Sequence, residues 1–363
     1  MILYRYFARR FLLTFAGMFG VFFLFYAMLD MIEIIRKFGG LSFAETVRLT
    51  MLNVPAGIYR ILPLVTILAT IMLFLNLARS SELVVTRAAG RSALRSLISP
   101  LLVAFAIGVV AVTAFNPIVA ATSRQYEALA NKYRKGTESV LSITREGLWL
   151  RQGGKDGPTV INAGRANADG TELFGVTFIG FSPDGLPRER IEAERARLTG
   201  GAWLVENAKR WRFVSGANPE AEAEQLARLT VPSDLTRERI RDGFGAPSTI
   251  PLWELPAFID SLEKAGFSSR RHQVWFLSEL ALPLLLVAMV MIGAGFTMRH
   301  TRFGRTGLMV LLALLAGFAI YFIRNFALIL GENGQIPPWL AAWAPPSAAI
   351  LLALGLLLHL EDG

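Results

Sequence analysis

Hydrophobic residues are concentrated in six long uncharged stretches of the chain, three on each side of about 150 more polar residues. Each stretch supplies the roughly 18 to 20 apolar residues that a helix needs to cross a hydrocarbon core about 30 Å thick. The pattern predicts a polytopic α-helical membrane protein with six transmembrane helices in a three-plus-three order. The predicted spans are Phe11–Leu29, Ile61–Ala78, Ser96–Ser123, Leu280–Met298, Thr306–Ile323 and Asn333–Leu360.

The polar middle of the chain changes from helical periodicity to alternation, with turn signals such as Asp169-Gly170 and Gly200-Gly201 between the segments. Short strands without long helical patterns between them favour an antiparallel sandwich or barrel. The apolar residues of the last-but-one predicted strand change from odd-numbered to even-numbered positions between Ala193 and Ala196, which predicts a β-bulge. The predicted strands are Ser139–Leu150, Thr159–Asn162, Leu173–Ile179, Arg188–Leu198 and Trp203–Phe213.

A helical pattern returns at Leu252–Ala265, where apolar residues recur on one face and Gly266 provides a C-terminal stop. We expect this amphipathic helix to lie at the outer membrane interface. The chain is thus predicted to contain four parts: helices 1–3 in residues 1–117, an external β domain in 118–250, an interfacial connector in 251–270, and helices 4–6 in 271–363.

Composition supports the membrane assignment, because 53% hydrophobic residues and a mean hydropathy of +0.45 do not suit a soluble fold. The net charge of +9 could indicate nucleic-acid binding. However, residues 118–270 hold 21 Lys and Arg against 20 Asp and Glu, so the excess lies in the membrane-associated remainder, with 16 against 8. We therefore expect no nucleic-acid partner. The absence of Cys excludes disulfides and thiol chemistry.

The positions of the charges predict the orientation, because short loops rich in Lys and Arg stay cytoplasmic. The opposite short segments hold only Arg36, Lys37 and Arg48. Both termini are predicted cytoplasmic and residues 118–270 external, with the first stretch retained as an anchor. The ten arginines on the predicted cytoplasmic side are Arg5, Arg9, Arg10, Arg79, Arg87, Arg91, Arg95, Arg299, Arg302 and Arg305.

The loop between the second and third spans predicts a short cytoplasmic helix at about residues 80–90. Ser80 or Ser81 can cap it, Glu82 suits its positive N-terminal end, and Gly90 can end it. An alternative is a basic loop that only sets topology and contacts lipid headgroups. Leu83, Val84 and Arg87 would present an apolar and charged face, and Ala88 and Ala89 would permit close approach.

This loop resembles the coupling helix of the LptF/LptG lipopolysaccharide-export permeases, whose pattern is Ser-Glu followed by Arg-Ala-x-Gly. The pattern matches Ser81-Glu82 and Arg87–Gly90. The resemblance covers essentially the full chain and is stronger to the LptG branch, through Arg87–Gly90 and Asn116-Pro117. Further matches are Asn116-Pro117 with Arg124–Glu127, Arg145–Arg151 and Ile336–Trp339.

The resemblance implies a β-jellyroll domain in the periplasm and a multi-pass location in the inner membrane of a Gram-negative bacterium. It implies three partners, namely a homologous LptF-like permease, a cytoplasmic LptB-like ATPase dimer and a membrane-anchored LptC-like periplasmic bridge, with lipopolysaccharide as the substrate. Glu82, Leu83, Arg87, Ala88 and Gly90 would couple the chain to the ATPase.

The chain is expected to hold no cofactor and to hydrolyse no ATP itself. It has no phosphate-binding loop of the Gly-x-x-x-x-Gly-Lys-Ser/Thr type, and Gly153–Gly157 is a poor substitute on the external side. ATP and Mg would be used by the partner ATPase. The three histidines are far apart and suggest neither a metal cluster nor a catalytic triad.

Two arginines, Arg60 and Arg324, lie in or beside hydrophobic stretches toward the external side, where a charge is a functional hypothesis by default. With Arg36 and Lys37 they are candidates for binding the phosphates of an anionic glycolipid. The resemblance favours Arg36 and Lys37 by position, since the family uses basic residues near the outer end of the first span. The alternative is snorkelling to ordinary headgroups. Glu279, directly before the first residue of the predicted fourth span, is expected to pair with a basic residue rather than carry a proton.

These features favour a transport permease subunit powered by a separate ATPase. Two alternatives are a membrane-tethered scaffold or sensor and a permease for another anionic lipid. A third is an ion-coupled secondary transporter, which normally shows broken helices or ionisable groups related by internal repeats.

Overall fold

The computed structural model describes residues 2–88, 90, 92–133, 141–144, 147–152, 157–167, 170–213, 218–233, 235, 236, 240, 246–264, 267–298 and 306–362. The chain forms two compact units. We call Met1–Tyr133, Ser248–Trp253 and Arg270–Gly363 the helical unit, and Arg134–Pro247 with Glu254–Ser269 the β unit. Several residues used in the sequence interpretation lie outside the described part: Ala89, Arg91, Arg145, Glu146, Gly266, Arg299, Arg302 and Arg305.

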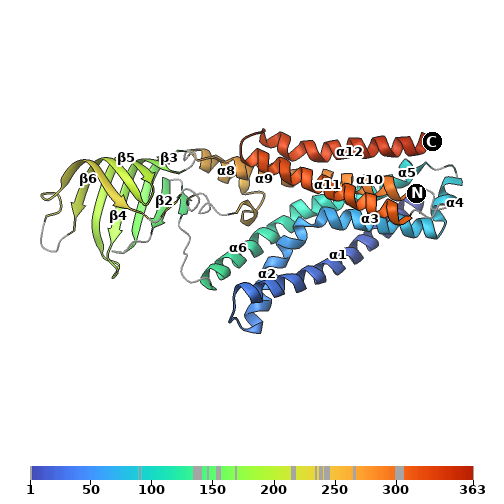
Figure 1. The fold of residues 1–363 in the computed structure, drawn as a ribbon, viewed down its shortest axis with the longest axis horizontal. Helices are drawn as coiled ribbons and strands as arrows, with labels where there is room; N and C mark the ends of the chain where they lie inside the picture. The colour runs from blue at the N-terminus through green and yellow to red at the C-terminus, as the bar shows by residue number, and fades with distance from the viewer. Residues whose placement is uncertain are drawn as a thin grey trace. The chain divides into compact units, whose positions relative to one another are not determined.

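Within the described residues, five helices are long and apolar enough to cross a membrane, and two shorter helices that meet at a 51° bend supply a sixth crossing. This confirms the three-plus-three prediction. The helices are α1 (Ile2–Lys37), α2 (Phe43–Arg60), α3 (Leu62–Arg79), α4 (Glu82–Ala88), α5 (Ala93–Val110), α6 (Asn116–Tyr133), α9 (Arg270–Leu280), α10 (Leu282–Thr297), α11 (Thr306–Glu332) and α12 (Pro338–Asp362) (Figure 1).

Several helices extend beyond the predicted spans. A capping box between Ser42 and Glu45 begins α2, which runs to Arg60 and meets α3 near Ile61, just before Pro63. A π-helix at Ala111–Phe115 joins α5 to α6. Because α6 continues to Tyr133, the predicted boundary at residue 117 falls inside a helix.

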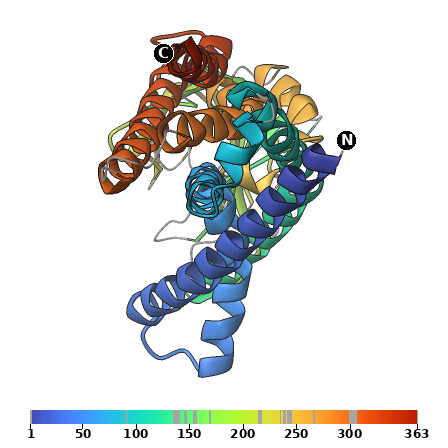
Figure 2. The ribbon, with the colours of Figure 1, turned by 90° about the vertical axis from the view of Figure 1, so that its right-hand side faces the viewer.

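The helical unit is built around α3 and α10. Figure 2 shows α3 end-on, with α1 on one side and α11 and α12 on the other. Within the chain, 61% of the apolar stretch of α3 is buried, but only 6% of that of α1 and 11% of that of α11. The apolar faces of α1 and α11 are therefore left for lipid or for another protein.

The β unit contains one seven-stranded antiparallel sheet in sequential order from β1 to β7, curved as seen in Figure 1. Trp203 and Phe178 are at the centre of its buried core, with ring centroids 6.3 Å apart. The strands are β1 (Leu141–Thr144), β2 (Gly147–Gln152), β3 (Thr159–Ala166), β4 (Glu172–Phe181), β5 (Pro187–Thr199), β6 (Ala202–Arg212) and β7 (Glu224–Pro232).

The sheet differs in detail from the predicted strands. Ser139–Leu150 was predicted as a single strand, but its described part belongs to the hairpin β1–β2, and β7 was not predicted. The described strands form one antiparallel sheet, in keeping with the predicted antiparallel β domain. β1 has only four residues, and the edge strand β7 alternates weakly. Neither has enough apolar positions to be recognised as a strand from its periodicity alone.

The buried positions of β5 do change from odd-numbered to even-numbered residues between Ala193 and Ala196, but the predicted bulge is not the cause. The pairing register of β5 with β4 and β6 is the same on both sides of Glu194. Gly175 on β4 and Asn207 on β6 have positive φ angles of 59° and 54° beside it. Adjacent strands thus kink together, which turns every side chain beyond the kink to the other face without a change of register.

The helix α8 (Leu255–Lys264) belongs to the β unit. Leu262 and the following Phe267 are part of the sheet core, and Phe258 packs against it. The apolar face that we expected at the membrane interface therefore contacts the sheet instead. The preceding segment Ser248–Trp253 belongs to the helical unit.

Candidate functional site

The short helix α4 forms where the sequence predicted a coupling helix. It begins at Glu82 and ends at Ala88, and Gly90 has a left-handed φ of 76°. Leu83 is buried within the chain, whereas Val84 and Val85 are exposed. The two valines are therefore the exposed large apolar side chains of α4. Ala88 is also exposed, and the Arg87 side chain lies outside the described part.

Glu82 connects α4 to the start of α1. Its Oε2 accepts a hydrogen bond from the Tyr6 hydroxyl at 2.7 Å, and its Oε1 accepts one from Ser80 Oγ at 2.8 Å. Arg10 lies 3.6 Å from the same carboxylate and over the Tyr6 ring. This carboxylate, predicted as an ATPase contact, thus already holds two helices of its own chain together.

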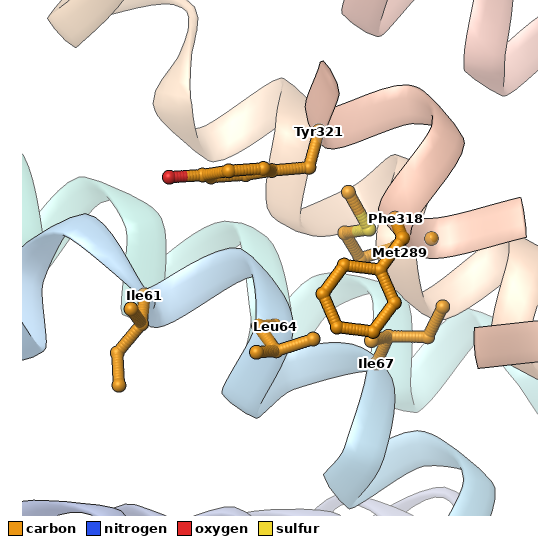
Figure 3. Close-up of a pocket in the computed structure, with 7 residues that line it drawn as sticks. Ile61, Leu64, Ile67, Met289, Phe318 and Tyr321 are labelled. Atoms are coloured by element: carbon orange, nitrogen blue, oxygen red, sulfur yellow. The ribbon is translucent and has the colours of Figure 1, made fainter. Parts of the chain in front are cut away.

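An apolar pocket of about 200 Å³ lies between α3, α10 and α11 (Figure 3). In Figure 3 the Tyr321 ring extends over the α3 side of the pocket with its hydroxyl toward Ile61, and Phe318 and Met289 lie nearer Ile67. Gly317 permits this close packing, since a Cβ there would be 2.6 Å from Ile67 Cδ1. The lining residues are Ile61, Leu64, Ile67, Met289, Gly317, Phe318 and Tyr321.

Two of the four cations singled out in the sequence lie next to residues of this pocket. Arg60 directly precedes Ile61 and is exposed, and Arg324 follows Tyr321 by one helical turn and is half-buried. The pocket wall is thus apolar, and these two cations are close in the chain to the lining residues Ile61 and Tyr321.

The other two cations are in the last turn of α1. Arg36 and Lys37 are both exposed, and Lys37 Nζ lies 5.9 Å from the centre of the Phe38 ring. None of the four cations is among the residues that line the apolar pocket, and Arg36 and Lys37 are also far in the chain from those residues. The four predicted headgroup ligands are therefore distributed over two places in the helical unit.

Three buried side chains of the helical unit form a polar group, and we call Tyr59, Asn116 and Glu279 the Glu279 cluster. The Tyr59 hydroxyl and Asn116 Nδ2, the latter at 3.0 Å, both donate hydrogen bonds to Glu279 Oε2. Asn116 Oδ1 accepts a hydrogen bond from the backbone N–H of Leu252 at 3.1 Å. The partners that the structure gives Glu279 are thus two neutral donors, and its expected pairing with a basic residue stays a prediction.

The Glu279 cluster lies where the helices are interrupted. Tyr59 is one residue before the end of α2, Asn116 follows the π-helix, and Glu279 precedes the bend between α9 and α10. Sequence reasoning noted Asn116 and Glu279 separately and missed Tyr59. Polar side chains inside apolar helices were the available signal, because they hydrogen-bond across helix interfaces.

Comparison with known proteins agrees with this architecture. The family model of the lipopolysaccharide export system permease LptF/LptG matches residues 5–359, and so covers both sets of helices and the β unit. The chain is similar to the lipopolysaccharide export system permease protein LptG of Escherichia coli K12 and to that of Escherichia coli O6:H1 strain CFT073. Each is 26% identical over 319 residues, which cover 85% of this chain and 84% of the relative. The chain belongs to the LptF/LptG family of lipopolysaccharide export permeases.

Proposed function

We propose that this chain is one of two permease subunits of an ATP-driven exporter that extracts lipopolysaccharide from the outer leaflet of the bacterial inner membrane. The observation that carries the proposal is the apolar pocket, whose lining residues Ile61 and Tyr321 are close in the chain to Arg60 and Arg324. Lipopolysaccharide combines acyl chains with phosphates. The pocket wall suits an acyl chain, and a guanidinium group binds phosphate bidentately.

The second permease of the proposed exporter would cover the free faces of α1 and α11. Leu24 on α1 and Phe322 on α11 are 71% and 66% exposed within this chain. In a bilayer, packing between helices drives such association, because lipid tails are as apolar as the side chains. The exposed Arg36 and Lys37, at the end of α1, would then lie where a lipid enters between the subunits.

The energy would come from a separate ATPase dimer that binds α4 and uses ATP with Mg. Val84 and Val85 supply an exposed apolar contact on α4. Figure 1 places α4 and both ends of the chain at the same end of the helical unit. This supports an orientation in which α4 and both termini are cytoplasmic, and the proposal has the β unit in the periplasm.

In this proposal the β unit receives the lipid and passes it to a membrane-anchored periplasmic bridge protein. The interior of its sheet is filled by its own side chains, and Leu262 and Phe267 belong to that core. A lipid that travels along the inner face must therefore displace α8 and its neighbours.

Site-specific photocrosslinking to lipopolysaccharide tests the proposal. A photoreactive residue at Phe318 is expected to label lipopolysaccharide, because Phe318 lines the pocket. Leu352 on α12, which is 70% exposed, serves as the matched control and is expected to label bulk phospholipid. Labelling of phospholipid alone at both positions would refute a lipopolysaccharide site in this pocket.

A further inference from the structure

Asn116 joins two parts of the helical unit through one side chain. Its Nδ2 donates a hydrogen bond to Glu279 Oε2 at 3.0 Å, and its Oδ1 accepts one from the backbone N–H of Leu252 at 3.1 Å. All three residues are buried, so both bonds are shielded from water. A buried polar group that loses its partner is costly. Because one planar amide group makes both bonds, a shift of either partner strains the bond to the other.

The segment Ser248–Trp253, which we call the connecting segment, is a part of the helical unit that interrupts the chain of the β unit. The β unit includes the residues directly before it and directly after it. Besides the bond from Leu252 to Asn116, the Thr249 carbonyl accepts a longer hydrogen bond of 3.4 Å from Arg124 Nε. Asn116 and Arg124 are about 12 Å apart along α6, at a rise of about 1.5 Å per residue. The connecting segment is therefore held to α6 at two points.

Two irregular helix segments lie next to the bond between Asn116 and Glu279. The π-helix Ala111–Phe115 ends directly before Asn116, and the 51° bend between α9 and α10 directly follows the turn that holds Glu279. Beyond both of them, α5 and α10 meet closely, since a Cβ on Gly108 would be 2.4 Å from the Cα of Pro283. The π-helix and the bend thus lie between two contacts of the same pair of chain segments, where a change in one is felt by the other.

The π-helix sets the direction of the Asn116 side chain. Each hydrogen bond of a π-helix spans one residue more than in an α-helix, as the bond from the Asn116 N–H to the Ala111 carbonyl shows. Conversion to a regular α-helix would rotate the residues after it by roughly 100°, the angle that one residue contributes in an α-helix. Asn116 would then point away from both Glu279 and Leu252. The π-helix and the two bonds of Asn116 therefore stabilise one another.

We propose that Asn116 is a positioning residue that couples the bend at Glu279 to the connecting segment, so that a change in the membrane helices reaches the chain of the β unit. The coupling is a property of the chain itself and goes beyond the proposed function. Its use in transport rests on the proposed function: movement of the helices during the ATP cycle would act through Asn116 on the chain that enters the β unit.

Hydrogen exchange at the Leu252 amide, measured at single-residue resolution in the purified full chain, tests the coupling. This N–H donates directly to Asn116, so Asn116→Ala should raise its exchange rate by up to about tenfold, as expected for the loss of one hydrogen bond. Glu279→Leu removes the other partner of Asn116 and should raise the rate at Leu252 by about fivefold, the lower end of typical coupling between sites. Glu279→Gln keeps an oxygen that can accept from Asn116 and should leave the rate near that of wild type.

Two comparisons separate the coupling from a general loosening of the helices. Ser278→Ala removes a buried hydroxyl next to Glu279 that donates to the Trp275 carbonyl of the same helix, and it should leave the exchange rate at Leu252 unchanged. In the Asn116→Ala background, Glu279→Leu should cause no further rise. An equal rise in both backgrounds, or no rise when wild type is changed to Glu279→Leu, would overturn the coupling.

A milder variant keeps the test decisive if Glu279→Leu does not fold. Tyr59→Phe removes the other donor to Glu279 and keeps the aromatic ring, which lies 5.8 Å from the Phe115 ring of the π-helix. Loss of this donor loosens Glu279, so exchange at Leu252 should again become faster, and by less than in Asn116→Ala. An unchanged rate in Tyr59→Phe would contradict the coupling.

The reconstituted exporter tests the use of the coupling in transport. Asn116→Ala should keep ATP hydrolysis and lower the lipopolysaccharide released per ATP by at least about fivefold. Normal export by Asn116→Ala would overturn this use. If the wild-type chain exports no lipopolysaccharide, the proposed function fails, whereas the exchange result at Leu252 still stands. If wild type exports and Glu279→Leu leaves exchange at Leu252 unchanged, the coupling is wrong and the proposed function stands.

Discussion

The link between α4 and α1 gives a prediction that separates two uses of Glu82. Tyr6→Phe removes the hydroxyl that donates to Glu82 Oε2 at 2.7 Å and leaves the exposed valines of α4 unchanged. If Glu82 acts by holding α4 against α1, this change should weaken the transmission of movement from a bound ATPase to the membrane helices. The ATPase itself should still bind.

The size of the effect follows from the hydrogen bond. A bond to a charged group contributes about 1.5–3 kcal/mol. The Glu82 side chain is 30% exposed, so we take the lower end. About 1.5 kcal/mol corresponds to roughly a tenfold loss in the population with α4 held on α1, since 1.4 kcal/mol is a factor of ten.

The assay measures three quantities in the assembled exporter: co-purification of the ATPase, ATP hydrolysis, and lipopolysaccharide released per ATP. Tyr6→Phe should keep the first two and lower the third by up to about tenfold. Leu352→Ala, an exposed change on α12, should alter none of them. If Tyr6→Phe exports normally while Glu82→Ala loses the ATPase, Glu82 is a direct ATPase contact and its link to α1 is incidental.

Three further predictions concern packing and pH. Gly108→Ala places a Cβ against the backbone of Pro283 and should destabilise the helical unit by about 1–3 kcal/mol, seen as a lower melting temperature; Gly355→Ala, with open space around it, should not. Trp203→Ala should cost the β unit about 3–5 kcal/mol in denaturant unfolding, because Trp203 is fully buried; a cost below 1 kcal/mol would contradict the core assignment. Arg197 and Arg195 lower the pKa of Glu172, so its contribution is present above the ordinary glutamate pKa of about 4.3 and is lost as the pH falls through the lowered value. Glu172→Gln should therefore flatten the acid side of the stability curve of the β unit, and an unchanged curve would refute the assignment.

The membrane architecture could be predicted from the sequence because it depends on local quantities. Apolar length identifies each span, and the helical pattern identifies α4, with Gly90 in the expected left-handed conformation. The limits of the strands were less predictable. Glu224–Pro232 forms an edge strand whose exposed positions dilute the alternation. The coordinated kink at Gly175 and Asn207 depends on three strands at once and cannot be read from one of them.

The Glu279 cluster could not be predicted because its members are far apart in the sequence. Tyr59 and Asn116 are 220 and 163 residues from Glu279, and only the folded helices bring them together. The sequence could show that Glu279 needed a partner, since an isolated charge in a span is costly. It could not show that Asn116 would satisfy Glu279 and the Leu252 backbone together.

The most direct test of the central claim follows lipopolysaccharide through the reconstituted exporter. Photoreactive residues would replace Phe318 in the pocket and Leu229, a partly buried residue packed against the core of the sheet. The account predicts labelling at Phe318 before ATP is added and labelling at Leu229 only after ATP is added with the ATPase present. Equal labelling at Leu229 with and without ATP, or none at either position, would contradict ATP-driven passage of lipid from the helical unit to the β unit.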